Sequence, residues 1–122
     1  MLILAGLFGL CAVLMGAFGS HALAARFTPR QMEIWEIGNL YHLVHAVALF
    51  GVALLAMARP GPMVSVAGLC FTLGMLLFAG SLYTIALTGF RSLGMLAPFG
   101  GLLLMIGWGC LVARGVALLR GR

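Results

Sequence analysis

The sequence predicts an all-α integral membrane protein: a four-helix bundle that crosses the bilayer, with a short interfacial helix between spans 1 and 2. Two observations support this fold class. Of the 122 residues, 64% are hydrophobic and only 7% are charged, whereas a soluble domain carries about 25% charged residues. In addition, four windows without charge each reach or exceed the roughly 20 residues that a helix needs to cross the hydrocarbon core. These windows are residues 1–25, 37–58, 60–90 and 92–113.

The first span is expected over residues 2–25, and we interpret it as a retained anchor rather than a cleaved signal peptide. It has no positively charged start, and its apolar stretch is longer than that of a signal peptide. Small residues recur at every fourth position, at Ala12, Gly16, Ser20 and Ala24. Such a ridge lets two helix backbones approach closely, so these residues are predicted to form a packing seam.

The polar segment after the first span predicts the interfacial helix. Thr28 is a suitable cap, Pro29 fits the first turn, and Gln31 can reach back to complete a capping box. Apolar side chains then alternate with acidic ones, which places Trp35 at headgroup level on the membrane surface. The alternative is a helix that continues without a break into the second span, although Gly38 offers a kink.

The other three spans are expected over residues 40–58, 63–88 and 98–119. The prolines and glycine of residues 59–62 predict a tight turn, which makes the second and third spans an antiparallel hairpin. We interpret residues 1–122 as a single four-span domain. An even number of spans puts both termini on one side of the membrane, and the slight excess of arginine there predicts that this side is the cytoplasm.

Charge and cysteine usage exclude several classes of function. The formal net charge is +5, and every basic residue is an arginine. These arginines stand singly at span ends, which is typical of interfacial anchoring to lipid phosphates, and without a basic stripe nucleic-acid binding is not expected. The three cysteines lie in different spans, so they predict no disulfide framework. Hydrolase and transferase motifs are absent, and the protein is not expected to be an enzyme or to carry a cofactor.

Alternate threading of the spans gathers most of their polar side chains in one leaflet. The candidate polar cluster comprises His21, Tyr41, His42, His45, Ser81 and Tyr83, with Thr84 and Thr88 nearby. Ionisable residues are costly in hydrocarbon and usually face the bundle interior, so His21 is expected to contact the second or third span. The favoured interpretation is that the cluster holds the helices in register. The alternatives are a proton, quinone or small-solute site, and a zinc or copper site built from His-x-x-His and a third histidine.

Four ordered motifs carry a resemblance that covers nearly the whole chain. They are "GAFGSHAL" (residues 16–23), "YHLVHA" after a tryptophan (41–46), "LFAGSLYTIALTG" (77–89) and "APFGGLLLMIGW" (97–108). In these motifs the chain resembles the small four-helix membrane proteins known as domain of unknown function 423, which in turn resemble the eukaryotic transmembrane-protein-256 group. The resemblance implies a bacterial inner-membrane protein with four spans and no assigned activity. That family commonly has glutamine at the position of His42, whereas His21 and His45 match it, and this argues against a metal site that needs His42.

Together these observations predict a small structural or accessory component of the inner membrane or of a membrane complex, with no bound metal or cofactor. Membrane lipid is the expected environment, and the candidate partners are another membrane protein or further copies of the chain. The alternative function is a carrier or sensor for a small solute, a proton or a metal, which would use the histidine-containing polar cluster.

Overall fold

The computed structural model describes residues 1–121 and consists of four long helices joined by short connections. Helix α1 (Leu2–Phe18) runs into a π-helical turn, η1 (Gly19–Leu23), and is followed by α2 (Pro29–Ala58) and α3 (Pro62–Thr88). A short 3-10 helix, η2 (Arg91–Met95), leads into α4 (Leu96–Arg120). Within the described residues there is no strand, and four segments are long and apolar enough to cross a membrane. The predicted all-α class and the four spans are thus confirmed.

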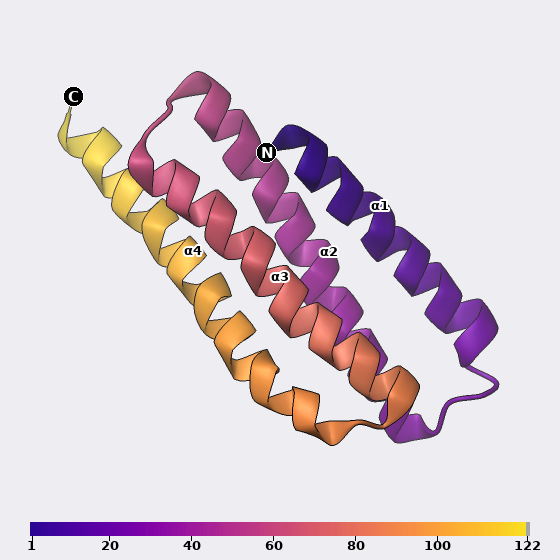
Figure 1. Ribbon diagram of the computed structural model, residues 1–122. Coiled ribbons are helices and arrows are strands. Elements are labelled where there is room, and N and C mark those ends of the chain that lie inside the picture. Colours follow the sequence, from indigo (N-terminus) through magenta and orange to yellow (C-terminus); the bar gives the residue numbers. More distant parts are fainter. Residues whose placement is uncertain (122) are drawn as a thin grey trace.

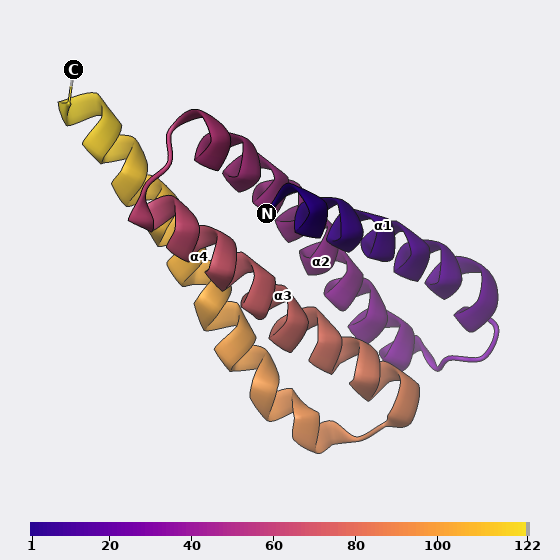
Figure 2. The same ribbon diagram turned by 45° about the horizontal axis from the view of Figure 1, so that its top comes forward.

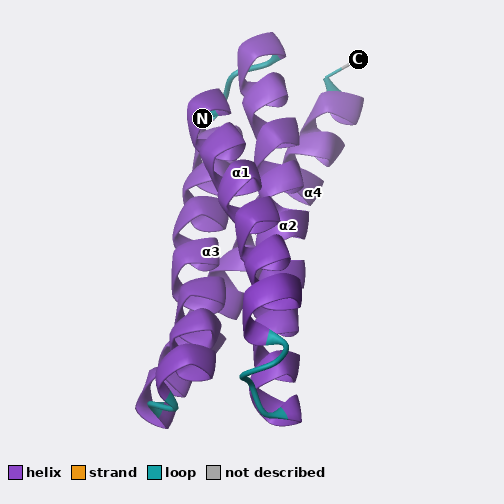
Figure 3. Cartoon of the chain, turned by 90° about the vertical axis from the view of Figure 1, so that its right-hand side faces the viewer, coloured by secondary structure: helices purple, strands orange, loops and turns teal. Residues whose placement is uncertain are grey.

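The four helices lie side by side in the order α4, α3, α2, α1, and each packs mainly against its neighbour in the sequence (Figure 1). Helices α2 and α3 are central, and the turned view shows α1 lying against α2 on the side away from α4 (Figure 2). The connections lie at the two ends of the bundle (Figure 3). Both chain ends lie at the end that carries the α2–α3 turn (Figure 1).

The main apolar core lies between the helices and is closed by very tight contact of α3 with α4. Its fully buried members include Phe71 and Leu49. Glycines on both helices allow the contact, since a Cβ on Gly100 would lie 2.5 Å from the backbone nitrogen of Phe78 and one on Gly107 would meet the Phe71 ring. Helix association in lipid depends on such close van der Waals packing, so these glycines set the distance between the two helices.

The outer surface of the helices is apolar over most of its length. Large hydrophobic side chains project from it on every helix, as Ile3 on α1 and Val112 on α4 illustrate. A contiguous apolar surface of this extent would aggregate in water but is stable against lipid chains. The exposed faces therefore agree with a protein whose solvent is the bilayer.

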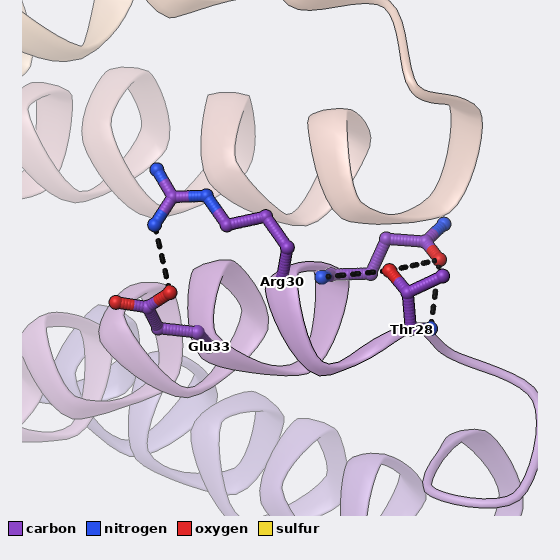
Figure 4. Close-up of polar contacts among 4 residues, drawn as sticks. Thr28, Arg30 and Glu33 are labelled. Carbon is purple, nitrogen blue, oxygen red and sulfur yellow. Dashed lines mark hydrogen bonds and ion pairs between the residues drawn. The ribbon is translucent and has the colours of Figure 1, made fainter.

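Helix α2 begins at the predicted capping box. The Oγ1 of Thr28 accepts a hydrogen bond from the backbone N–H of Gln31 at 3.3 Å, and Gln31 Oε1 accepts one from the Thr28 N–H at 3.0 Å (Figure 4). In the same turn Arg30 Nη1 donates to Glu33 Oε2 at 2.7 Å (Figure 4). Both charged side chains are exposed, so this pair contributes little to stability, and the start of the helix is defined by the capping box.

The separate interfacial helix between spans 1 and 2 is not present, and that prediction is wrong. Helix α2 is continuous from Pro29 to Ala58. Trp35 is buried against α1 instead of lying on the membrane surface. Gly38 lies inside this unbroken helix, and its missing side chain lets the Cβ of Leu82 on α3 approach to 3.2 Å from where its own Cβ would be. Trp35, Met32 and Ile34 at the start of α2 pack within the bundle, whereas Ile37 is 40% exposed.

The loops follow the turn residues of the sequence. Pro62 is the first residue of α3, as the tight turn predicted, and the Nη2 of Arg114 on α4 donates to the carbonyls of Arg59 and Pro60 at 3.3 and 3.4 Å. Helix α3 ends at Gly89, whose φ of 71° is left-handed, a conformation that glycine adopts at little cost. These contacts tie α4 to the α2–α3 turn and fix the reversal of direction before α4.

Candidate functional site

The buried polar side chains form two separate groups around α2. His42 and His45 are 7% and 6% exposed, and their spacing of three residues places them about 60° apart around the helix. This angle is enough to direct them to different neighbours. His42 faces α3 and α1, whereas His45 faces α4.

The first group joins α2 to α3 through a chain of two hydrogen bonds. Tyr83 on α3 donates its hydroxyl proton to Asn39 Oδ1 at 3.0 Å, and His42 Nδ1 lies 3.2 Å from the same hydroxyl oxygen. Because Tyr83 has a single hydroxyl proton, His42 Nδ1–H must donate to its oxygen. A neutral ring is expected, since a charge inside hydrocarbon is costly, and Nε2 then carries a free lone pair. This Nε2 is buried and has no hydrogen-bond partner among residues 1–121.

The second group joins α2 to α4 and leaves no ring nitrogen unpaired. His45 Nδ1 lies 2.8 Å from the backbone carbonyl of Tyr41, which can only accept, so Nδ1 carries the proton. His45 Nε2 therefore accepts from the indole N–H of Trp108 at 3.2 Å. The imidazole also meets the rings of Phe71 and Trp108 edge to face, with centroids 5.6 and 6.1 Å away. His45 is thus a fully satisfied link between two helices.

A third set of polar contacts links the helices near the start of α2, on the N-terminal side of His42. Trp35 Nε1 donates to the Met15 carbonyl at 3.0 Å, and Gln31 Nε2 donates to the Ala86 carbonyl at 3.0 Å. The first contact joins α2 to α1 and the second joins α2 to α3. Both bonds use backbone carbonyls inside helices, so they add interhelical links without breaking the spans.

The π-helical turn begins where side chains engage the carbonyls at the end of α1. The Met15 carbonyl accepts from Trp35, and the Gly16 carbonyl accepts from Ser20 Oγ at 2.6 Å. Side chains that engage helix carbonyls disturb the regular hydrogen-bond ladder, and the wider turn, with an Ala24 N–H bond to the Gly19 carbonyl at 3.0 Å, begins at that point.

His21 does not join the hydrogen-bonded polar groups, and the expectation that it faces the bundle interior is wrong. Its side chain is exposed and has no hydrogen-bond partner among residues 1–121. The π-helical turn directs Gly19 and Leu23 inward, which leaves His21 on the outer side. At the end of the first span it is close to headgroup level, where its ring nitrogens can be solvated.

The other members of the predicted cluster have local roles. Ser81 is buried, and its hydroxyl donates to the Phe78 carbonyl of its own helix at 2.9 Å. Tyr41 is 43% exposed, and its ring stacks on His45 and lies tilted against Phe78. Thr84 and Thr88 each donate to a carbonyl four residues earlier. Of the predicted cluster, only His42, His45 and Tyr83 therefore make side-chain hydrogen bonds between helices.

The predicted packing seam contacts α2 over half of its length. Ala12 is 1% exposed, and a Cβ on Gly16 would lie 2.9 Å from Asn39 Nδ2. Ser20 and Ala24 are exposed and border an open groove between this end of the first span and α2. The seam diverges from α2 where the π-helical turn begins, and Gly19 and Leu23 are buried in its place.

The arrangement offers no ready metal site. Within the described part of the chain, no group of three or more His, Cys, Asp or Glu side chains is placed to hold an ion. The zinc or copper interpretation needed His42, His45 and His21 together, whereas the first two face different helices and the third lies outside the bundle.

Sequence reasoning missed Asn39, Trp108, Gln31 and the indole of Trp35 as interhelical donors or acceptors. A usable signal existed for Asn39 and Trp108, because an amide and an indole N–H inside an apolar span need partners. Pairing Asn39 and Trp108 with the polar residues at equal depth on the other helices would have pointed to Tyr83 and His45.

The sequence is similar to that of known membrane proteins. The family described as "Protein of unknown function (DUF423)" matches residues 15–101. The "UPF0382 membrane protein YwdK" of Bacillus subtilis is 38% identical over 119 residues, which cover 97% of each chain. The "UPF0382 inner membrane protein YgdD" of Escherichia coli K12 is 32% identical over 120 residues, which cover 98% of this chain and 92% of the relative. No solved structure matches the chain.

These matches confirm the resemblance seen in the four motifs, whereas the relation to the transmembrane-protein-256 group stays a prediction. They also agree with the four spans, since the relatives are named as membrane proteins and one of them as an inner membrane protein. The chain therefore belongs to the DUF423 family of integral membrane proteins, a family to which no activity is assigned.

Proposed function

We propose that this protein is a structural or accessory component of the inner membrane or of a membrane complex, and that it is not an enzyme. The observation that carries the proposal is how the polar side chains between its helices are used. The side chains of Trp35, Gln31, Tyr83 and Trp108 each donate a hydrogen bond to a neighbouring helix. Polar groups that make such bonds hold the helices in register, and these four donors are not free to take part in catalysis.

The acidic residues and the histidines also support a structural role. Catalysis by acid and base needs a carboxylate or imidazole within reach of a nucleophile. The carboxylate of Glu33 is paired with Arg30 at the surface, the imidazole of His45 is saturated by its two partners, and the free Nε2 of His42 is hydrogen-bonded to no nucleophile among residues 1–121. We expect the protein to act through contact with lipid and with another membrane protein or further copies of itself, and not with nucleic acid.

Native purification tests this proposal. The tagged protein, expressed at its natural level and extracted in a mild detergent, is expected to retain a larger membrane protein in stoichiometric amount or to migrate as a defined oligomer. A tagged, unrelated four-span protein of similar size is the control for proteins that co-purify with any membrane protein. A monomer without a stoichiometric partner, combined with specific uptake of a solute by vesicles that contain it, would overturn the proposal in favour of a carrier.

We further propose that both termini lie in the cytoplasm. Arg59, Arg114 and Arg120 mark the end of the bundle that holds the termini, against Arg26, Arg30 and Arg91 at the other end, and positive charge favours the cytoplasmic side. Arg122, which provides the excess, lies outside the described residues. A reporter fused to the C-terminus is expected to be cytoplasmic and one inserted at Ser92 to lie across the membrane. The reverse result would invert the orientation, and both reporters on one side would contradict the four spans.

A further inference from the structure

A pocket of about 380 Å³ opens between α1 and α3, beside His42. Leu4 and Phe8 line it from α1, and Met75, Ala79 and Gly80 line it from α3. Both helices cross the membrane, and α2 separates them, so the pocket opens sideways toward the lipid. Its volume lies within the range of small-molecule sites and is more than twice that of a 150 Å³ cavity that accepts benzene.

One side chain beside the pocket has an unmet hydrogen-bonding need. His42 is 7% exposed, and its Nε2 is buried and has no hydrogen-bond partner among residues 1–121. Buried polar atoms without a partner are rare because each costs free energy. His45, three residues further on, shows the contrast, since both of its nitrogens are paired.

The hydrogen bonds of His42 define what the missing partner must be. Tyr83 gives its only hydroxyl proton to Asn39, so His42 Nδ1–H donates to Tyr83 and Nε2 is left as an acceptor. A partner must therefore bring an O–H or N–H group. The rest of the wall consists of hydrocarbon and sulfur-containing side chains and of Tyr83, whose hydroxyl is already engaged by Asn39 and His42, so the body of the partner must be apolar.

We propose that this pocket binds a lipid-soluble hydroxylated ring compound of the phenol class, whose hydroxyl donates to His42 Nε2. The rings occupy the space between Leu4 of α1 and Met75 of α3. The Phe8 ring stands edge to face with the imidazole, with the centroids 5.7 Å apart. Because Nε2 is buried in the unliganded protein, the side chains that cover it must move aside to admit the hydroxyl.

Two matched probes test the donor requirement. 1-Naphthol and 1-methoxynaphthalene share the same rings and the same oxygen, but only the first can donate a hydrogen bond. Titration calorimetry of the whole protein in detergent, corrected with protein-free micelles, is expected to show about tenfold tighter binding of 1-naphthol, the gain of one buried hydrogen bond to an otherwise unpaired group. Equal affinities, or tighter binding of the methoxy compound, would overturn the proposal.

Two further variants locate the binding. A Cβ on Gly80 has nothing within 4 Å, so Gly80→Leu fills the pocket without a clash, and Gly51→Leu adds the same side chain to an equally open position that does not line it. Gly80→Leu is expected to abolish binding of both probes and Gly51→Leu to leave it unchanged. His42→Leu is expected to make the two affinities equal. Binding that survives Gly80→Leu at full strength would place the probes elsewhere and overturn the site, even if His42→Leu fails to fold.

Discussion

Replacing Gly100 by alanine is expected to destabilise the protein by about 1–3 kcal/mol, the usual cost of overpacking a core, and to loosen α4 from α3. The new Cβ would lie 2.5 Å from the backbone nitrogen and 2.9 Å from the Cα of Phe78. Backbone atoms cannot rotate away as a side chain does, so the whole of α4 must shift. That shift would also weaken the neighbouring contacts of Gly107 with Phe71 and of Trp108 with His45.

The control for this variant is Gly109→Ala on the same helix. Its Cβ meets nothing within 4 Å, so it adds the same methyl group and the same helix propensity without a steric consequence. Unfolding by SDS titration in mixed micelles measures both variants. Equal stabilities for Gly100→Ala and Gly109→Ala would mean that α3 and α4 do not cross as closely as the structure describes.

The fold was predictable because lipid imposes simple rules. Residues without charge over the length of a bilayer must form spanning helices, since backbone groups find no other partners in hydrocarbon. Local signals were equally direct at Thr28 and Gln31, where the capping box depends on four consecutive residues, and at Pro62 after the tight turn.

The interfacial helix was mispredicted because two environments share one pattern. A helix with tryptophan and isoleucine between acidic residues suits a membrane surface, and it equally suits the first turns of a span whose apolar side faces other helices. Only the partner surface distinguishes them. Trp35 finds that partner in the Met15 carbonyl, 20 positions earlier in the chain.

Of the predicted polar cluster, His42 and Tyr83 do contact each other, but His45 and His21 do not join them. Depth follows from counting residues along each span, which brought His42 and Tyr83 together. The direction of a side chain around its helix depends on helix rotation and on local irregularities. The π-helical turn at Gly19–Leu23 is such an irregularity, and no periodicity in the sequence marks it, so the outward position of His21 could not be predicted from the sequence.

The position of the Trp35 indole explains why a glycine precedes the Ser20-His21 pair. Gly19 has ordinary helical φ and ψ of −57° and −51°, so its backbone does not require glycine, and alanine would be the better helix former there. A Cβ at this position would instead overlap Nε1 of Trp35 and lie 2.8 Å from Cδ1. The glycine is needed because the indole lies directly on the backbone while it donates to the Met15 carbonyl.

Gly19→Ala is therefore expected to destabilise the protein by about 1–3 kcal/mol through overpacking, with the Trp35 hydrogen bond to Met15 lost as the indole is displaced. Gly9→Ala, whose Cβ meets nothing within 4 Å on the same helix, should have little effect. Trp35→Phe removes Nε1, the nearer of the two atoms that Gly19→Ala would strike, so the double variant should be more stable than the sum of the two single losses predicts. SDS unfolding of the unsubstituted protein, the two single variants and the double variant measures this coupling. Strictly additive losses would contradict the contact, because two substitutions that share no partner lower stability independently.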